Sequence, residues 1–253
     1  MISQLEKEVT LRFLKTRKND GFLNIISIFS FIGISLGVAV LIIVMSVMNG
    51  FRTELINKIV GFNAHAVVKP YDKPIDSRKL NEVNLYNNVL MNIYSNDGEA
   101  VILNKKNIKG ILLKGYFEKD FKKLEIIKNS DFIGDAKLID NSISIGKELS
   151  FNLNLAIGDT LTIMSPNGIK TIIGALPKQE NFEVASIFDS GLSDFNENVA
   201  YINLKTLENF FEKDQKERFL EYYFKNPHDV ENHKKILLQF FKNEFVYTWA
   251  DLN

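Results

Sequence analysis

The segment Gly21–Phe51, GFLNIISIFSFIGISLGVAVLIIVMSVMNGF, contains no charged residue across 31 positions. Most of its residues between Ile25 and Met48 are Ile, Leu, Val, Phe or Met. About 20 apolar residues suffice to span a bilayer, so this segment can cross it with some tilt. A cleavable signal peptide has a shorter apolar core and a small-residue cleavage site, which Val44–Asn49 does not offer. The segment therefore predicts a transmembrane helix over residues 21–51.

The charges on either side of this segment predict its orientation. Residues 1–20 carry five basic and three acidic side chains, whereas residues 52–253 carry 26 and 28. The excess of Lys and Arg before the span places the amino terminus in the cytoplasm. Leu5, Val9 and Phe13 recur at a spacing of four, which predicts either a short cytoplasmic amphipathic segment on the inner membrane face or a solvated tail. Residues 52–253 are then extracytoplasmic.

The composition excludes several classes of protein. The chain has 253 residues, with 31 basic and 31 acidic side chains and no cysteine. A net charge of zero argues against a nucleic-acid partner, because such proteins normally present a basic surface. Without cysteine there is no disulfide framework, thiol nucleophile or iron–sulfur cluster, which is compatible with an oxidising compartment.

Hydrophobic periodicity predicts a mixed domain after the span. A helical stripe continues to a stop at Gly61. Period-two patterns then predict strands at Ala64–Lys69, Val89–Tyr94, Ala100–Asn104, Asn107–Tyr116, Thr160–Met164, Phe182–Phe188, Val199–Ile202, Phe219–Phe224 and Phe245–Trp249. Helical spacing predicts helices at Phe117–Ile127, Gly146–Leu153, Leu204–Phe211 and Val230–Phe241. Strands alternating with helices in this way predict an α+β or α/β-plait domain.

Residue patterns for catalysis are absent from the sequence. His228 and His233 are five apart and would point in different directions on a helix, so we interpret them and His65 as surface histidines. Ser142–Glu148 superficially resembles a phosphate loop, but it lacks the first glycine, and Glu148 replaces the required Ser or Thr. We therefore predict no catalytic residue, no metal site, no cofactor and no enzymatic activity.

Two sets of residues within the span predict contacts in the membrane. The first set is small and would let another helix approach closely: Ser30, Gly33 and Gly37. The second set forms a flexible apolar surface near the outer interface: Val44, Val47, Met48 and Phe51. For each set the alternative is plain contact with lipid.

A third candidate lies between turn signals in the extracytoplasmic part. Ile169–Pro177 should form a loop or a protruding hairpin, and its apolar side chains are Ile172, Ile173, Leu176 and Pro177. Clustered exposed apolar side chains predict a docking surface. The alternative is a loop that folds back onto its own domain.

The sequence resembles a known family over essentially its whole length. The shared motifs are Leu11-Arg12-Phe13-Leu14, Ser30-x-x-Gly33-Ile34-x-Leu36-Gly37-Val38, Ser46-Val47-Met48-Asn49-Gly50-Phe51 with Glu54-Leu55, Ile143-x-Ile145-Gly146-x-Glu148-Leu149, Leu155-x-x-Gly158-Asp159, Gly174-x-x-Pro177, Phe182-x-Val184 and Trp249-x-x-Leu252. They resemble the start of a lipoprotein-releasing permease, the LolC/LolE-type membrane subunit of an ABC transporter in Gram-negative bacteria.

The resemblance implies a fold and a function. It implies an inner-membrane protein whose periplasmic α+β domain combines a porter-like subdomain with an inserted, mostly β subdomain over residues 117–190. With its one predicted span, this chain would be single-pass. Such permeases pair, bind a cytoplasmic ABC ATPase that hydrolyses the ATP, and pass lipoprotein cargo from the membrane lipid to a periplasmic lipoprotein carrier. Val44, Val47, Met48 and Phe51 would then contact acyl chains, and the segment from Ile172 to Pro177 would be the hook that contacts the carrier, held by Gln179.

Two departures from the family pattern qualify this expectation. Thr162 and Glu180 stand where the LolC type carries arginines that face the carrier, so carrier binding here uses another pattern or is lost. Family members also have three further spans, whereas this sequence stops at Asn253, which predicts a truncated product or one half of a split gene. A separately encoded carboxy-terminal half would then be a partner. The alternatives are a single-pass anchored periplasmic scaffold or binding domain, and a non-functional truncated remnant.

Overall fold

The computed structural model describes residues 3–14, 21–86, 88–104, 107–128, 131–166, 169–171 and 174–252. The chain divides into two compact units, Met1–Ile56 and Asn57–Asn253, and each is considered by itself.

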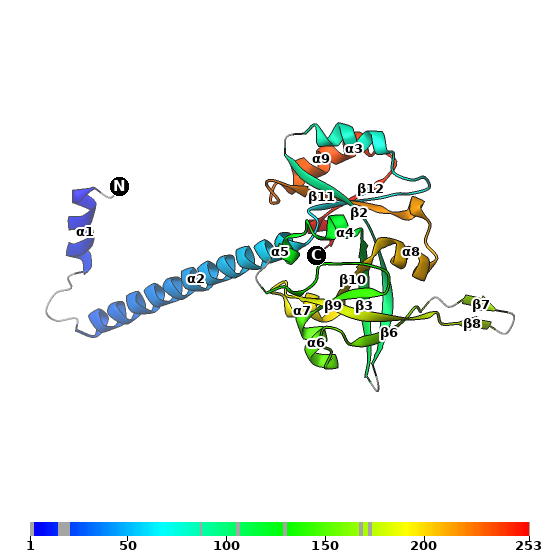
Figure 1. Cartoon of the computed structure of the whole chain (residues 1–253). Coiled ribbons are helices and arrows are strands. Elements are labelled where there is room, and N and C mark those ends of the chain that lie inside the picture. Colours follow the sequence, from blue (N-terminus) through cyan, green and yellow to red (C-terminus); the bar gives the residue numbers. More distant parts are fainter. Residues whose placement is uncertain are drawn as a thin grey trace. The chain divides into compact units, whose positions relative to one another are not determined.

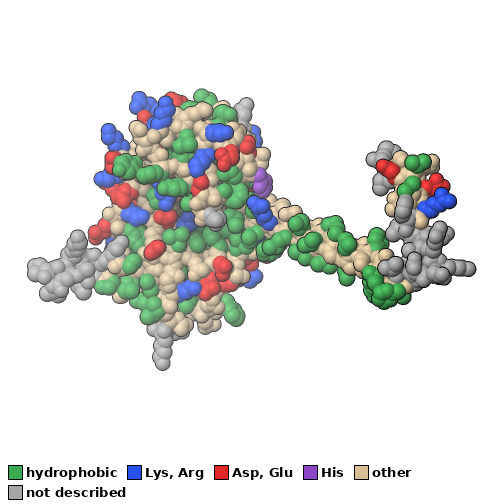
Figure 2. All heavy atoms as spheres, turned by 180° about the vertical axis from the view of Figure 1, so that it is seen from behind, with side chains coloured by type: hydrophobic (Ala, Val, Ile, Leu, Met, Phe, Trp, Pro, Cys, Tyr) green, Lys and Arg blue, Asp and Glu red, His purple; other side chains and the backbone are tan. Residues whose placement is uncertain are grey.

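The first unit contains helix α1 (Gln4–Leu14) and most of helix α2 (Gly21–Phe62). α2 is a single unbroken helix of 42 residues, roughly 63 Å long at ~1.5 Å per residue, about twice the thickness of a bilayer core. Among the described residues, one helical stretch, Ile25–Phe62, is long and apolar enough to cross a membrane. Figure 2 shows hydrophobic side chains along this helix, while basic and acidic side chains are scattered among hydrophobic and other groups on the visible face of the second unit. The predicted apolar helix and its extension to Gly61 are confirmed, whereas the limits 21–51 of the membrane span remain a prediction.

The second unit begins with an interleaved pair of β-α-β motifs. The first motif comprises β1 (Ala66–Lys69), α3 (Ser77–Asn84) and β2 (Val89–Asn104), and the second comprises β11 (Phe219–Phe224), α9 (Val230–Phe240) and β12 (Phe245–Thr248). Their strands lie in the order β12-β1-β11-β2, and all three neighbouring pairs are antiparallel. This is the split β-α-β plait. α3 and α9 cover one face of it (Figure 1).

The chain between β2 and β11 extends the same sheet rather than starting another. Its order continues from β2 as β3 (Asn107–Tyr116), β10 (Val199–Asn203), β5 (Ser142–Gly146), β9 (Gln179–Phe188) and β4 (Ile133–Gly134), while β6 (Thr160–Met164) pairs with β2 and β9. The pairs β3–β10 and β5–β9 are parallel. The inserted subdomain predicted over residues 117–190 lies within this interruption of the plait, and its limits remain a prediction.

Short helices connect these strands. They are α4 (Glu118–Phe121), α5 (Glu125–Lys128), α6 (Lys147–Leu153), α7 (Ser193–Asn198), α8 (Leu204–Phe211), the 3₁₀ turn η1 (Gln215–Glu217) and α10 (Trp249–Leu252). α8 packs on β3, β2 and β10, and its Phe211 ring lies where a side chain at Gly98 would have its Cβ, 2.6 Å from that position. The glycine therefore lets β2 run straight past α8. The α+β fold class is confirmed.

Several local predictions are wrong. Val89–Asn104 is one strand instead of two, and Phe117–Ile127 forms two short helices instead of one. His65 and His233 are buried, with 8% and 1% of their surface exposed, and only His228 lies on the surface as predicted. The His65 ring contacts the Val60 carbonyl of α2 and the backbone N–H of Phe224 in β11. The ring centroids of His233 and Phe224 are 3.8 Å apart, and the two rings are stacked. Burial lowers the pKa of the His233 imidazole.

Candidate functional site

The apolar stripe of α2 comprises Val44, Val47, Met48 and Phe51. These side chains are 57%, 66%, 64% and 64% exposed. Their i, i+3, i+4, i+7 spacing places them on one face of the helix. A surface of this kind contacts only apolar matter, whether lipid, another helix or an acyl chain.

The small residues of α2 lie on the same face as the stripe. Each small residue lies 14 positions before a residue of the stripe; the pairs are Ser30 and Val44, Gly33 and Val47, and Gly37 and Phe51. In an unbroken helix, 14 residues turn through an angle about 40° short of four full turns, so the members of each pair point in nearly the same direction. A Cβ at Gly33 or Gly37 would meet nothing within 4 Å, so the face is uncovered in the isolated chain. One face of α2 thus has a small half toward the amino terminus and a bulky apolar half toward the second unit.

That arrangement has a geometric consequence for any partner helix. Glycines allow close backbone approach, whereas Val, Met and Phe side chains hold a neighbouring helix further away. A partner that packs on the glycines would therefore be held apart at the apolar stripe. The space between the two helices would open toward the carboxyl end of α2.

The arm of the second unit comprises β7 (Ile169–Thr171) and β8 (Gly174–Leu176), a two-stranded sheet that extends from the ends of β6 and β9 (Figure 1). The protruding hairpin predicted for Ile169–Pro177 is confirmed by the pairing of these strands. Ile172 and Ile173 lie outside the described residues, and the side chain of Leu176 is likewise undescribed. Pro177 is exposed directly after β8.

A lysine that the sequence analysis did not single out holds the base of the arm. Lys178 Nζ donates to the backbone carbonyl of Asn209 at 2.7 Å, lies 3.3 Å from the Glu180 carboxylate and lies 5.8 Å from the centre of the Phe210 ring. The Lys178 carbonyl in turn accepts from the backbone N–H of Ser165 at 2.9 Å. Asn209 and Phe210 follow Lys178 in the sequence by about 30 residues, which is why no local pattern indicated these contacts.

Gln179 makes a weaker contact than Lys178. Its Nε2 lies 3.8 Å from the sulfur of Met164, the residue opposite it in the β6–β9 ladder. Two positions further along the ladder, Thr162 Oγ1 donates to Asn181 Oδ1 at 2.8 Å. Thr162 thus pairs with Asn181 and Glu180 with Lys178 at the arm base, and neither Thr162 nor Glu180 presents a positive charge.

The last turn of α2, which belongs to the second unit, contacts the side chain of His65. The His65 Nε2 lies 3.1 Å from the Val60 carbonyl in the last turn of α2, and its Nδ1 accepts from the backbone N–H of Phe224 at 2.8 Å. Its backbone N–H donates to Tyr222, and its carbonyl accepts from Trp249. Burial lowers the pKa of the His65 imidazole to about 4, so the ring is neutral near pH 7.

Comparisons with known proteins agree with this architecture. The family model for the MacB-like periplasmic core domain matches residues 27–237. The chain is 23% identical over 218 residues to the lipoprotein-releasing system transmembrane protein LolC of Xylella fastidiosa (strain Temecula1 / ATCC 700964), covering 85% of this chain and 53% of that protein. It is 27% identical over 209 residues to LolC of Neisseria meningitidis serogroup B, covering 79% and 50%.

LolE is also among the relatives. The chain is 27% identical over 194 residues to the lipoprotein-releasing system transmembrane protein LolE of Haemophilus influenzae, covering 71% of this chain and 45% of that protein. The crystal structure of the periplasmic region of MacB from Actinobacillus actinomycetemcomitans superposes with a TM-score of 0.46 at 10% identity, covering 78% of this chain and 93% of that one.

An amino-terminal apolar helix followed by a split β-α-β plait with a long insertion defines the α+β class of this chain. The chain belongs to the family of the MacB-like periplasmic core domain. The resemblance to LolC/LolE-type permeases is confirmed. The chain spans about half the length of the curated relatives it matches.

Proposed function

We propose that this chain is part of the membrane subunit of an ATP-driven transporter that releases lipoproteins from the inner membrane. The observation that carries the proposal is the alignment with LolC, which covers 85% of this chain and so includes at least part of the span and most of the domain. In this proposal the amino terminus is cytoplasmic, in agreement with the basic residues before the span. The second unit is periplasmic.

The apolar stripe of α2 is the proposed contact for the acyl chains of the cargo. Moving an acyl chain out of lipid costs about 0.8 kcal/mol per CH₂, so an extracted chain needs a replacement apolar surface. Val44, Val47, Met48 and Phe51 offer such a surface at the outer half of the span. A second permease segment on Ser30, Gly33 and Gly37 would leave this half open to the outer leaflet.

The arm is the proposed docking site for the periplasmic carrier. Exposed Pro177 and the apolar sequence before it could insert into a partner that binds apolar chains. Lys178 keeps the arm base on α8 through its bond to Asn209. A fixed base limits the entropy that a projecting hairpin loses when it docks.

The energy for release would come from other polypeptides. The partners of this proposal are a cytoplasmic ABC ATPase, a second permease subunit or a separately encoded carboxy-terminal half, the lipoprotein cargo and the carrier. ATP hydrolysis belongs to the ATPase, and this chain acts by binding and positioning.

Purification from native membranes tests the proposal. The full chain carrying an affinity tag should retain an ABC ATPase and a permease segment through a mild-detergent wash, and the Gly37→Leu variant should lose the permease segment. A chain that retains a soluble periplasmic protein but neither an ATPase nor a permease segment would instead be an anchored scaffold. That result would contradict the transport proposal.

A further inference from the structure

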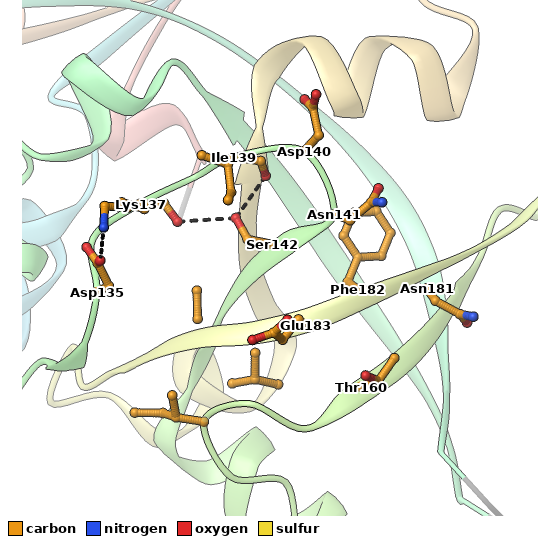
Figure 3. A pocket seen from close by; sticks show the side chains of 13 residues that line it. Asp135, Lys137, Ile139, Asp140, Asn141, Ser142, Thr160, Asn181, Phe182 and Glu183 are labelled. Carbon is orange, nitrogen blue, oxygen red and sulfur yellow. Dashed lines mark hydrogen bonds and ion pairs between the residues drawn. The ribbon is translucent and has the colours of Figure 1, made fainter.

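A surface cavity of about 510 Å³ lies in the second unit at one end of the β6–β9 ladder, apart from the arm. Its size falls within the range of about 300–1,000 Å³ that is typical of ligand sites. Figure 3 shows the side chains that line it, with Asp135 and Lys137 at one end and Thr160 and Asn181 at the other.

Two backbone hydrogen bonds fix the walls of the cavity. The segment 135–141 is held to β9 at both ends, by Asp135 N–H to the Ala185 carbonyl at 3.0 Å and by Glu183 N–H to the Asn141 carbonyl at 2.8 Å. Between them, Ser142 Oγ donates to the carbonyls of Lys137 (3.2 Å) and Ile139 (2.8 Å) (Figure 3). The cavity is therefore preformed.

Apolar side chains provide most of the cavity's surface. Ile139 and Ile157 are 57% and 44% exposed on its rim, and Phe182, Val184 and Ala185 line it from β9. Large aliphatic side chains that stay exposed around a concave site favour an apolar ligand, because covering them removes apolar area from water.

The polar rim of the cavity has a negative balance. Asp135, Asp140 and Glu183 line it together with a single base, Lys137, whose Nζ lies 2.7 Å from Asp135. Because that base is already paired, the Glu183 carboxylate sets the sign of the local field, and the Asp140 carboxylate, which also accepts from Thr206 Oγ1 at 3.3 Å, adds to it at the edge of the rim. Carboxylates on an apolar rim favour a ligand that carries a cation beside its apolar group.

We propose that this cavity binds a peptide segment of an extracytoplasmic partner, in which a large aliphatic side chain is flanked by Lys or Arg. The aliphatic group would fill the space between Ile139 and Ile157, and the flanking cations would pair with Asp140 and Glu183. The proposal concerns a site separate from the arm and from the apolar stripe, and it does not depend on lipoprotein release.

The test uses the full chain in nanodiscs of zwitterionic lipid, with empty nanodiscs subtracted. The probe is a fluorescein-labelled tetrapeptide with two isoleucines between two arginines, and its anisotropy reports binding. Two matched probes replace the arginines by glutamates or the isoleucines by serines. The first probe should bind saturably, and both matched probes should bind at least about tenfold more weakly.

Substitutions at the cavity should weaken binding of the first probe. Ile139→Ser with Ile157→Ser should raise its dissociation constant about tenfold, and Glu183→Gln should raise it less and reduce its salt dependence. Ile108→Ser and Glu231→Gln, at exposed positions that do not line the cavity, are the matched controls and should leave it unchanged. Equal melting temperatures show that the variants fold.

Three results would overturn the proposal. The first is the absence of saturable binding by the first probe, and the second is equal binding by the cavity variants. The third is a dimer of the wild-type chain that Ile139→Ser dissociates, which would assign the cavity to a second copy of this chain.

Discussion

The imidazole Nδ1 of His65 accepts a hydrogen bond of 2.8 Å from the backbone N–H of Phe224, 159 residues further along the chain. The same ring lies 3.1 Å from the Val60 carbonyl through Nε2. One neutral side chain thus connects the last turn of α2 to the central strand β11. The imidazole must accept a hydrogen bond on Nδ1 and donate one from Nε2, which only the neutral ring with its proton on Nε2 can do.

The stability of the second unit should therefore fall on acidification. Burial lowers the His65 pKa from 6.5 to about 4, with His233 and His228 acting in the same direction and the bond to Val60 opposing them. Between these values the unfolded chain binds the proton more readily, so the stabilisation is complete above pH 6.5 and is lost as the pH falls toward 4. The loss is on the order of 3 kcal/mol.

His65→Asn isolates this contribution. Asparagine can still accept from Phe224 but does not titrate, so the variant should be less stable at pH 7 by about 1–3 kcal/mol and less sensitive to pH between 6.5 and 4. Urea unfolding of the full chain, followed by the fluorescence of the single tryptophan, Trp249, measures both. Parallel pH profiles of the two proteins would contradict this assignment.

Gly146 should tolerate no side chain. A Cβ there would lie 2.0 Å from the backbone carbonyl oxygen of Asn196, in α7, so the start of α6 and α7 would have to separate. Gly146→Ala should destabilise the domain by about 1–3 kcal/mol or more. Gly110→Ala is the control, because a Cβ at Gly110 meets nothing within 4 Å. Equal unfolding midpoints for the two variants would contradict the packing.

Glu221 should be the most sensitive buried charge of the sheet. Its carboxylate accepts from Ser95 Oγ at 2.8 Å, Tyr116 OH at 2.9 Å and Tyr223 OH at 3.1 Å, with Lys114 Nζ 3.6 Å away. Glu221→Ala leaves these buried donors without their acceptor and should lower the free energy of unfolding by about 3–5 kcal/mol.

The control for Glu221 is an exposed ion pair. Glu125 and Lys128 are 2.6 Å apart with more than half of each side chain exposed, so Glu125→Ala should cost less than about 1 kcal/mol. Chemical unfolding of the two variants compares them directly. A Glu221→Ala protein as stable as Glu125→Ala would show that the buried network contributes little.

The small half of the α2 face, which contains Gly33 and Gly37, should control the association of α2 with another helix in the membrane. Gly37→Leu fills the surface where a partner helix would approach, and we expect at least about a tenfold loss of the co-purifying permease segment. Ser35→Leu adds a similar volume on the opposite face of the same turn and should have no effect. Equal losses from both variants would mean that α2 does not use this face.

Elements with a one-sided apolar pattern could be predicted from the sequence. Asn107–Tyr116, Thr160–Met164, Leu204–Phe211 and Phe219–Phe224 have the predicted limits, because each has a clear period of two or 3.6. Ser142–Gly146 was missed as a strand. All five of its residues are buried, so its two serines occupy covered positions and the pattern resembles a polar loop.

Polar elements and distant contacts could not be predicted in this way. α3 has a mostly polar sequence and begins at a side-chain cap, where Asp76 accepts from the backbone N–H of Arg78. Lys178 bonds to Asn209 and His65 to Phe224, both in distant parts of the chain, so these contacts follow from the fold alone. The α2 face, in contrast, could be predicted, because helical spacing alone places its residues together.

Photo-crosslinking from α2 tests most directly whether the apolar stripe contacts the acyl chains of a lipoprotein. A photoreactive residue at Met48, in native membranes, should crosslink to a lipoprotein, and the crosslink should disappear when the lipoprotein lacks its acylated cysteine. The same residue at Ser46, on the opposite face at nearly the same depth, should give no such crosslink. Equal crosslinking from both positions, or crosslinking that does not depend on acylation, would contradict the proposal that this face contacts the acyl chains.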